Sequence, residues 1–279
     1  MILENHAISP DLQAYIEAIF HFKGFQPDHS IERVVPTGHI FLIFELDGIP
    51  RNTFDNDTLA PQQTFTEAWI SGIHKRYISI SAHQDSEMFV IQFKPTGAYP
   101  FLHLPIHELN GKVVPAEKVL GQEIIQLRSA ILRGEDNAAK FRIAENWLIK
   151  RFAADKAPPA AILQLVEQLK QAPALTASEL NQLIQAYPFT QKHLIDQFKK
   201  YLGLTPKYYQ RIFRFNEILG KIYQKEKLSW TRISYECGYT DQSHFIKEFK
   251  HFSGFNPQEF LGQNFSNEEP NFFPLDREG

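Results

Sequence analysis

The side chains best suited to a chemical task lie in two similar segments, 193–206 and 244–257, which align without a gap at an offset of 51 residues, 244 minus 193. Six of the fourteen aligned positions are identical. On a helix, one face of each copy would carry amide, hydroxyl and ammonium groups, which hydrogen-bond to base edges and pair with phosphates. These outward residues are Gln191, Lys192, Asp196 and Lys199 in the first copy and Gln242, Ser243, Lys247 and Lys250 in the second.

The elements that must hold these side chains follow from the same sequence. Thr190 and Asp241 are residue types that cap helix N-termini, and each copy ends in Gly-x-x-Pro, which stops one helix and starts the next. A shorter helical segment precedes each copy, at 176–186 and at 229–237, with a tight turn between. A helix, a short turn and a second helix with a polar outer face form a helix-turn-helix unit. The sequence therefore predicts two such units.

A single helix is predicted between the units, at 205–224. One side of it is an apolar stripe, and the other side carries basic side chains, among them Arg211 and Arg214. Its roughly 19 residues would form a rod of about 28 Å. That length is close to the ~34 Å between successive major-groove faces on one side of DNA. We therefore expect recognition helices at about 190–200 and 241–250 to enter adjacent major grooves, with Arg211 and Arg214 contacting the DNA.

Residues 178–261 resemble the C-terminal DNA-binding domain of the AraC/XylS family of transcription regulators. The motifs LIDQFKKYLGLTPKYYQRIFRFNEI and ISYECGYTDQSHFIKEFKHFSGFNPQEF are similar to the two halves of that family's signature. The second turn keeps the usual glycine as Gly238, whereas the first has Tyr187-Pro188 in its place. The resemblance implies that bases are read by Lys192, Ile195 and Asp196 in the first unit and by Gln242, Ser243 and Lys247, with His244 beside them, in the second.

The front of the chain predicts a β-rich domain. From residue 11 to about 95, short apolar or alternating runs are separated by Gly, Pro, Asn and Asp, which favours an antiparallel barrel or sandwich. Residues 117–153 change to helical spacing and predict two amphipathic helices. More loosely, residues 11–155 resemble the cupin-like domain attached to many AraC-type regulators, which implies effector sensing, dimerisation or both.

The domain boundary is expected at the small-residue and proline stretch that ends at Pro159. The predicted fold class is α+β, with a β-rich domain at 1–155, an all-α double helix-turn-helix domain at 160–262 and an acidic, flexible tail at 263–279. Because the linker separates two hydrophobic patterns, we expect each domain to have its own core.

Composition and charge limit the kinds of partner that the chain is expected to bind. Of the 279 residues 43% are hydrophobic, no apolar run is long enough to cross a bilayer, and the N-terminus lacks the pattern of a signal peptide, so we expect a cytoplasmic location. Residues 160–262 carry a net charge of +4 between segments of −4 and −3, as a polyanion-binding surface would. The expected partners are double-stranded DNA and an unidentified small-molecule effector, with RNA polymerase and a second copy of the chain as further candidates. We expect no metal, cofactor or membrane.

The alternative left open is a cupin-like metal-dependent sensor or enzyme domain fused to a DNA-binding module. The front domain contains His39, His74, His83, His103 and His107, and the last two have a spacing that suits a metal on a helix. Pro105 between them argues against a regular helix, and no nucleophile motif is present. The single cysteine, Cys237, can form no intrachain disulfide and is expected to be an inert buried group. The sequence therefore favours a regulator that is not an enzyme.

Overall fold

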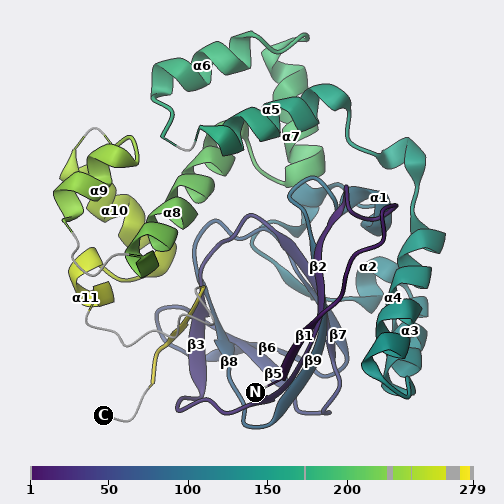
Figure 1. Cartoon of the computed structure of the whole chain (residues 1–279). Helices are drawn as coiled ribbons and strands as arrows, with labels where there is room; N and C mark the ends of the chain where they lie inside the picture. The colour runs from purple at the N-terminus through teal and green to yellow at the C-terminus, as the bar shows by residue number, and fades with distance from the viewer. Residues whose placement is uncertain (1, 173, 225–228, 240, 262–270, 277–279) are drawn as a thin grey trace.

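The computed structural model describes residues 2–172, 174–224, 229–239, 241–261 and 271–276. Its front half contains two antiparallel sheets that face each other, as Figure 1 shows. The six-stranded sheet has the order β1-β2-β9-β4-β7-β10, and the five-stranded sheet has the order β11-β3-β8-β5-β6. The strands are β1 (Ile2–Asn5), β2 (Ile16–Phe25), β3 (Ile31–Val34), β4 (Ile40–Glu45), β5 (Arg51–Phe54), β6 (Pro61–Phe65), β7 (Ala68–Ser71), β8 (Ile78–Ser81), β9 (Ser86–Phe93), β10 (Val113–Pro115) and β11 (Phe272–Pro274).

The centre of the six-stranded sheet is apolar on both faces, because helices cover its outer side and the second sheet faces its inner side. Phe89, Ile91 and Phe93 of β9 point outward and are fully buried under the helices, while Val90 between them points inward. The β-rich front domain predicted from the sequence is thus confirmed.

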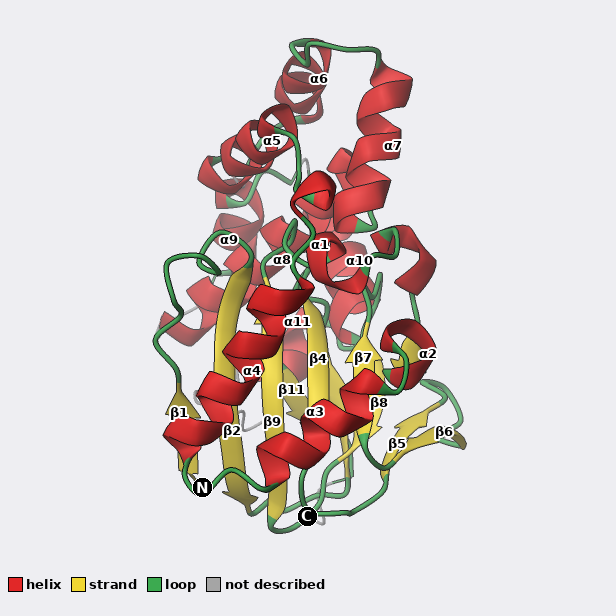
Figure 2. Cartoon of the chain, turned by 90° about the vertical axis from the view of Figure 1, so that its right-hand side faces the viewer, coloured by secondary structure: helices red, strands yellow, loops and turns green. Residues whose placement is uncertain are grey.

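The helical elements between β9 and α5 are α1 (Tyr99–Leu102), the 3-10 helix η1 (Ile106–Leu109), α2 (Glu117–Leu120), α3 (Glu123–Leu132), α4 (Asn137–Arg151) and the 3-10 helix η2 (Ala154–Lys156). Figure 2 shows α3 and α4 lying across the outer face of the six-stranded sheet. Their buried residues, among them Ile131, Phe141 and Leu148, recur at helical spacing. The two amphipathic helices expected in this region are therefore present.

The remaining helices are α5 (Ala160–Gln171), α6 (Ala177–Gln185), α7 (Gln191–Leu202), α8 (Pro206–Gln224), α9 (Trp230–Glu236), α10 (Gln242–Ser253) and α11 (Pro257–Leu261). The predicted caps are formed, since the side chains of Thr190 and Asp241 accept hydrogen bonds from the first turns of α7 and α10. Gly203 and Gly254 end the two helices in the left-handed conformation, at φ 74° and 77°. Local capping chemistry thus sets both limits of each helix.

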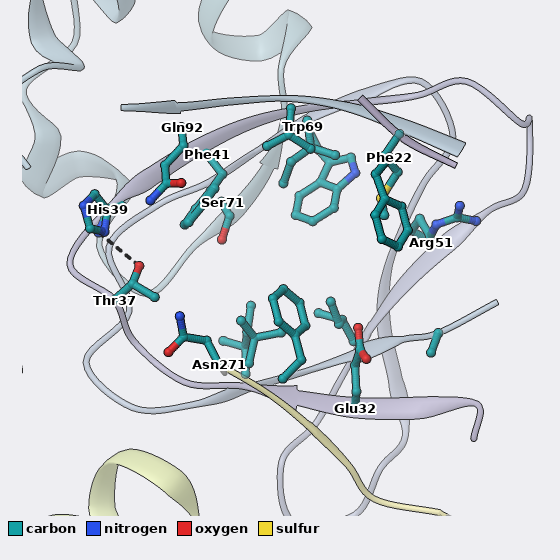
Figure 3. Close-up of a pocket in the computed structure, with 18 of the residues that line it drawn as sticks. Phe22, Glu32, Thr37, His39, Phe41, Arg51, Trp69, Ser71, Gln92 and Asn271 are labelled. Atoms are coloured by element: carbon teal, nitrogen blue, oxygen red, sulfur yellow. Dashed lines mark hydrogen bonds between the residues drawn. The ribbon is translucent and has the colours of Figure 1, made fainter. Parts of the chain in front are cut away.

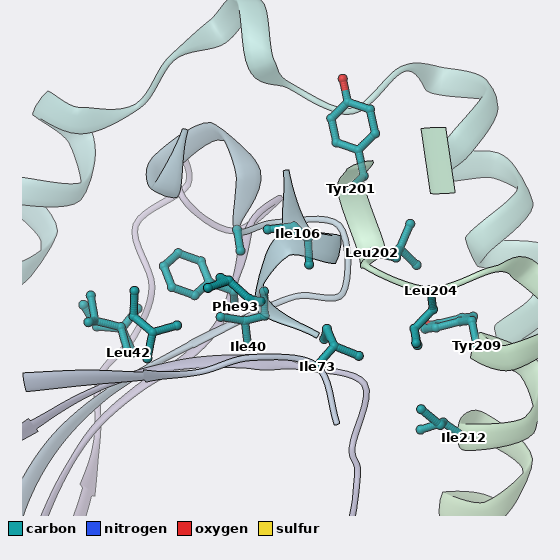
Figure 4. Packing of buried hydrophobic residues seen from close by; sticks show 14 of the residues in the cluster. Ile40, Leu42, Ile73, Phe93, Ile106, Tyr201, Leu202, Leu204, Tyr209 and Ile212 are labelled. Atoms are coloured by element: carbon teal, nitrogen blue, oxygen red, sulfur yellow. The ribbon is translucent and has the colours of Figure 1, made fainter. Parts of the chain in front are cut away.

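The two domains share one continuous apolar cluster, contrary to the expectation of two separate cores. In Figure 4, Leu202, Leu204, Tyr209 and Ile212 of the helical domain lie beside Ile73 and Ile106 of the front domain. Polar contacts reinforce this junction: the Asn110 side-chain amide donates to the Gly203 carbonyl, and Asn216 Nδ2 donates to Pro36 O at 3.0 Å. The helical domain is therefore held against one end of the β-rich domain (Figure 1).

Part of the segment expected to be a flexible tail is an ordered strand instead. β11 pairs antiparallel with β3, and Asp276 Oδ1 accepts hydrogen bonds from the backbone amides of Ser30 and Ile31 at 3.0 and 2.8 Å. Phe273 is fully buried against Phe255 and Phe260 of the helical domain. The expectation of flexibility does not hold for residues 271–276, because these aromatic and hydrogen-bonding contacts fix them. Residues 263–270 and 277–279 of that segment lie outside the described residues.

Candidate nucleic-acid interface and inner cavity

The N-terminal halves of α7 and α10 face solvent. Gln191, Lys192 and Asp196 are exposed on α7, together with Lys199 one turn further on, and Ile195 is half-buried. On α10 every candidate DNA contact is exposed: Gln242, Ser243, His244, Lys247 and Lys250. Because recognition helices contact base edges through their N-terminal residues, both helices present the correct end.

The C-terminal ends of the same helices pack on the front domain. A Cβ on Gly203 would come within 3.0 Å of Ile106, and one on Gly254 would come within 2.6 Å of the Tyr77 ring. Arg33 of β3 lies over the rings of Tyr77 and Phe255, at 4.5 and 4.4 Å. The two glycines occupy the same place in the sequence repeat, so the repeat provides two equivalent docking points as well as two polar faces.

The guanidinium groups of Arg211 and Arg214, which the sequence analysis expected to contact DNA, are paired within the protein, and only Arg211 keeps appreciable exposure. Arg214 is buried, with Nη2 2.6 Å from Glu248 Oε1, and Arg211 Nε lies 2.7 Å from Glu248 Oε2. Tyr239 OH donates to the same carboxylate at 2.7 Å, and the Arg214 guanidinium stacks over the Tyr239 ring at 4.0 Å. In this arrangement the two arginines of α8 hold α10, the second recognition helix, against α8.

Glu248 is the centre of this cluster and was not among the predicted site residues. Burial alone would raise the pKa of Glu248, but Arg214, Arg211 and Tyr239 outweigh it and lower the pKa below its ordinary value. Burial raises the pKa of the Tyr239 hydroxyl, which therefore stays protonated and donates. The sequence signal was the pair of arginines three residues apart on α8, which an inward carboxylate could bridge.

The turns of the two units differ as the sequence does. Gly238 has φ 74°, and a Cβ there would lie 2.5 Å from the Ala174 carbonyl oxygen, so the second turn needs glycine. Tyr187 stands at the equivalent place in the first unit without a left-handed backbone. Its ring is buried and stacks beside that of His193, with centroids 6.1 Å apart. A packed aromatic side chain thus replaces the glycine turn in the first unit.

A cavity of about 430 Å³ lies between the two sheets of the front domain (Figure 3). Phe41 and Trp69 come from the six-stranded sheet, Ile78 and Ile80 line it from the facing sheet, and Phe272 of β11 contributes to the wall. Figure 3 shows His39, Gln92 and Asn271 grouped at one end, and Glu32 and Arg51 near the other. The sequence pattern showed strands with apolar faces but gave no sign that the faces stand apart.

The front-domain histidines considered as metal ligands lie in different surroundings. His39, His74 and His83 line the cavity, whereas His103 hydrogen-bonds to the carbonyls of Pro100 and Arg151 at 3.0 and 3.2 Å. Burial lowers the pKa of both His39 and His74 to about 4, so both rings are neutral at pH 7. Within the described ranges, no three His, Cys, Asp or Glu side chains form a group that could hold a metal ion. Cys237 is buried, and burial raises the pKa of its thiol.

Comparison with protein families gives two matches. Residues 183–263 match a helix-turn-helix domain, and residues 4–115 match a domain of unknown function, DUF6597. No curated protein matches the chain. In the described part of the chain, no helix is long and apolar enough to cross a membrane.

Matched solved structures include ToxT from Vibrio cholerae in two states. A ligand-free ToxT variant has 12% identity over 90% of this chain and 97% of that chain, with a TM-score of 0.45. ToxT bound to an unsaturated fatty acid has 14% identity over 88% of this chain and 94% of that chain, with a TM-score of 0.44.

The fold and the matched helix-turn-helix domain define a DNA-binding protein with a β-rich domain at its N-terminus. The paired units joined by α8 have the arrangement that the sequence resemblance to AraC-type regulators predicted. The resemblance read from the sequence is thereby confirmed.

Proposed function

We propose that the chain regulates promoters by placing α7 and α10 in adjacent major grooves, under the control of a small molecule bound in the front-domain cavity. The observation that carries the DNA-binding part is the exposure of the N-terminal half of both recognition helices, each anchored at its other end. The linking helix α8 has 19 residues, and a helix of that length is about 28 Å long, close to the spacing of adjacent grooves on one side of DNA. No catalytic step belongs to the proposal, and its setting is the cytoplasm, where DNA is available.

The two units are proposed to contribute unequally. Gln242 and Lys247 of α10 carry donor groups that reach purine edges, and a good base contact is worth about 1–3 kcal/mol of discrimination. The first unit offers Gln191 and Asp196 at the matching places, and the carboxylate of Asp196 is repelled by phosphates. We therefore assign sequence reading mainly to α10 and positioning mainly to α7.

The effector response is supported by two routes from the cavity wall to the helical domain. The first is the segment from Val35 to His39, which lines the cavity and lies against α8: the Pro36 carbonyl accepts a hydrogen bond from Asn216, and a Cβ on Gly38 would lie 3.7 Å from the Tyr209 ring. The second is β11, in which Phe272 faces the cavity while Phe273 packs against Phe255 and Phe260. A ligand that shifts either wall would shift the recognition helices, since both elements are packed and not free to absorb the change.

The experiment that tests the DNA-binding assignment compares Lys247→Ala with Asp196→Ala, two exposed charges on α10 and α7. Competition titrations of specific against scrambled duplexes at fixed salt should show that Lys247→Ala loses specificity, whereas Asp196→Ala keeps it and raises overall affinity. An unchanged specificity ratio for Lys247→Ala would mean that α10 only anchors to phosphates. Contact with RNA polymerase and pairing with a second copy belong to the same proposal, and half-site spacing in selected genomic fragments would reveal a dimer.

A further inference from the structure

The cavity also limits the chemistry of the molecule it can bind, an inference that rests on the proposed effector function. Its walls are mainly aromatic and aliphatic, with Phe41 and Trp69 on one sheet and Ile78 and Ile80 on the other. Burial of apolar ligand surface there is favourable by roughly 25 cal/mol per Å². A volume of about 430 Å³ is in the range of small-molecule sites.

The charged side chains of the cavity are already paired. Among the lining residues that the structure describes, Glu32 is the only carboxylic acid and Arg51 the only arginine or lysine, and burial raises the pKa of Glu32. Arg51 Nε lies 3.2 Å from Glu45 Oε2, its Nη2 pairs with Asp47, and its Nη1 donates to Ile49 O at 3.1 Å. Glu32 Oε2 lies 3.2 Å from His29 Nε2. A charged ligand group would therefore find no unpaired counter-charge.

Uncharged polar groups gather at one end of the cavity. The carboxamides of Gln92 and Asn271 line the cavity there, and Nδ1 of His39 is buried without a hydrogen-bond partner. Figure 3 shows these three side chains at the same end. A carboxamide both donates and accepts, so this end suits a group that does the same. The neutral His39 ring adds no charge that would attract an anion.

We propose that the cavity binds an uncharged, mostly apolar molecule that carries a hydroxyl, carbonyl or amide group at the end lined by Gln92, His39 and Asn271. An anion or a cation of the same shape loses its hydration without gaining a partner. The proposal thus excludes free carboxylic acids and amines as the preferred ligands.

Three probes of matched shape test the class: 2-naphthylmethanol, 2-naphthoate and 2-naphthylmethylamine, which are neutral, anionic and cationic at pH 7. Each is titrated against the full chain loaded with the uncharged fluorophore N-phenyl-1-naphthylamine, whose emission rises in apolar surroundings. We expect the alcohol to displace the fluorophore at least about tenfold more tightly than either ion. Equal or tighter binding of the carboxylate or the amine overturns the proposal, and so does failure of the fluorophore and the alcohol to bind.

Two variants test whether the probes bind in this cavity. Gln92→Leu keeps the size of the side chain and should weaken the alcohol about fivefold while leaving 2-methylnaphthalene unchanged, because only the alcohol loses a hydrogen bond. Ile80→Trp fills the cavity and should weaken every probe, whereas Ile149→Trp, at a position 46% exposed on α4, should weaken none. Probes unaffected by both Gln92→Leu and Ile80→Trp would place the binding elsewhere and overturn the proposal.

DNA binding is measured on the same samples, so that the two proposals can fail separately. If the probes bind in the wrong order while DNA is bound with salt-sensitive affinity, the ligand class is wrong and the DNA-binding function stands. If the order is as expected and no DNA is bound, the ligand class stands and the regulatory function is wrong.

Discussion

Replacement of Glu248 by alanine should destabilise the helical domain more than any exposed change on α10. Its side chain is 3% exposed and accepts hydrogen bonds from Arg211, Arg214 and Tyr239. Removal of the carboxylate leaves the Arg214 guanidinium, 8% exposed, without its charge partner inside the protein. Arg211 is 29% exposed and can turn toward water, so most of the loss comes from Arg214.

The expected loss is about 3–5 kcal/mol in the free energy of unfolding, the range for breaking a buried ion pair from one side. Glu248→Gln keeps acceptor and donor groups in place and should lose less. Urea unfolding followed by circular dichroism measures the change from the shift in midpoint at a common slope.

The sequence repeat offers a matched control for this experiment. Gln197 occupies the place of Glu248 in the first unit, is half-buried and has no such cluster, so Gln197→Ala should cost less than about 1 kcal/mol. If Glu248→Ala shifted the midpoint no more than Gln197→Ala, the arginines would not depend on this carboxylate. They would then be available for DNA, as the sequence alone suggested.

Two further predictions follow from the same helices. Phe249→Ala should cost about 3–5 kcal/mol, because the ring is fully buried against Phe215, Phe245 and Phe260, and near-unchanged thermal melting would contradict the packing. Acid should destabilise the native chain more strongly than it destabilises the Glu248→Gln variant. The pKa of Glu248 is lower in the folded than in the unfolded chain, so its carboxylate stabilises the fold fully above about pH 4.5. This contribution is lost as the pH falls through the folded pKa. Parallel unfolding titrations from pH 6 to pH 3 compare the two, and identical acid sensitivity would show that Glu248 is not the responsible group.

The helix-turn-helix units could be predicted in detail because their signals are local. Thr190, Asp241, Gly203 and Gly254 act within one turn of their own helices, and capping residues and left-handed glycines have the same meaning in any fold. The polar faces of α7 and α10 followed from helical spacing alone.

What the sequence could not predict depends on contacts between distant segments. Arg214 and Glu248 are 34 residues apart, and only the packing of α10 on α8 turns both inward. The hairpin of β5 and β6 has no clear sequence signal, because β6, with the sequence PQQTF, is exposed at four of its five residues and has no apolar alternation. The cavity depends on the separation of two sheets, which no strand pattern encodes.

The position of β11 has a consequence for how the protein is made. The strand lies within the last eight residues of the chain, yet it pairs with β3, which forms early in the sequence and is otherwise the edge of its sheet. During synthesis from the N-terminus, the front domain and both helix-turn-helix units leave the ribosome before β11 does, so the cavity lacks the wall at Phe272 until β11 has emerged and paired with β3. A chain cut short by a late stop codon would keep its recognition helices and lose this wall. A chain without β11 would therefore have both recognition helices but not the complete cavity wall.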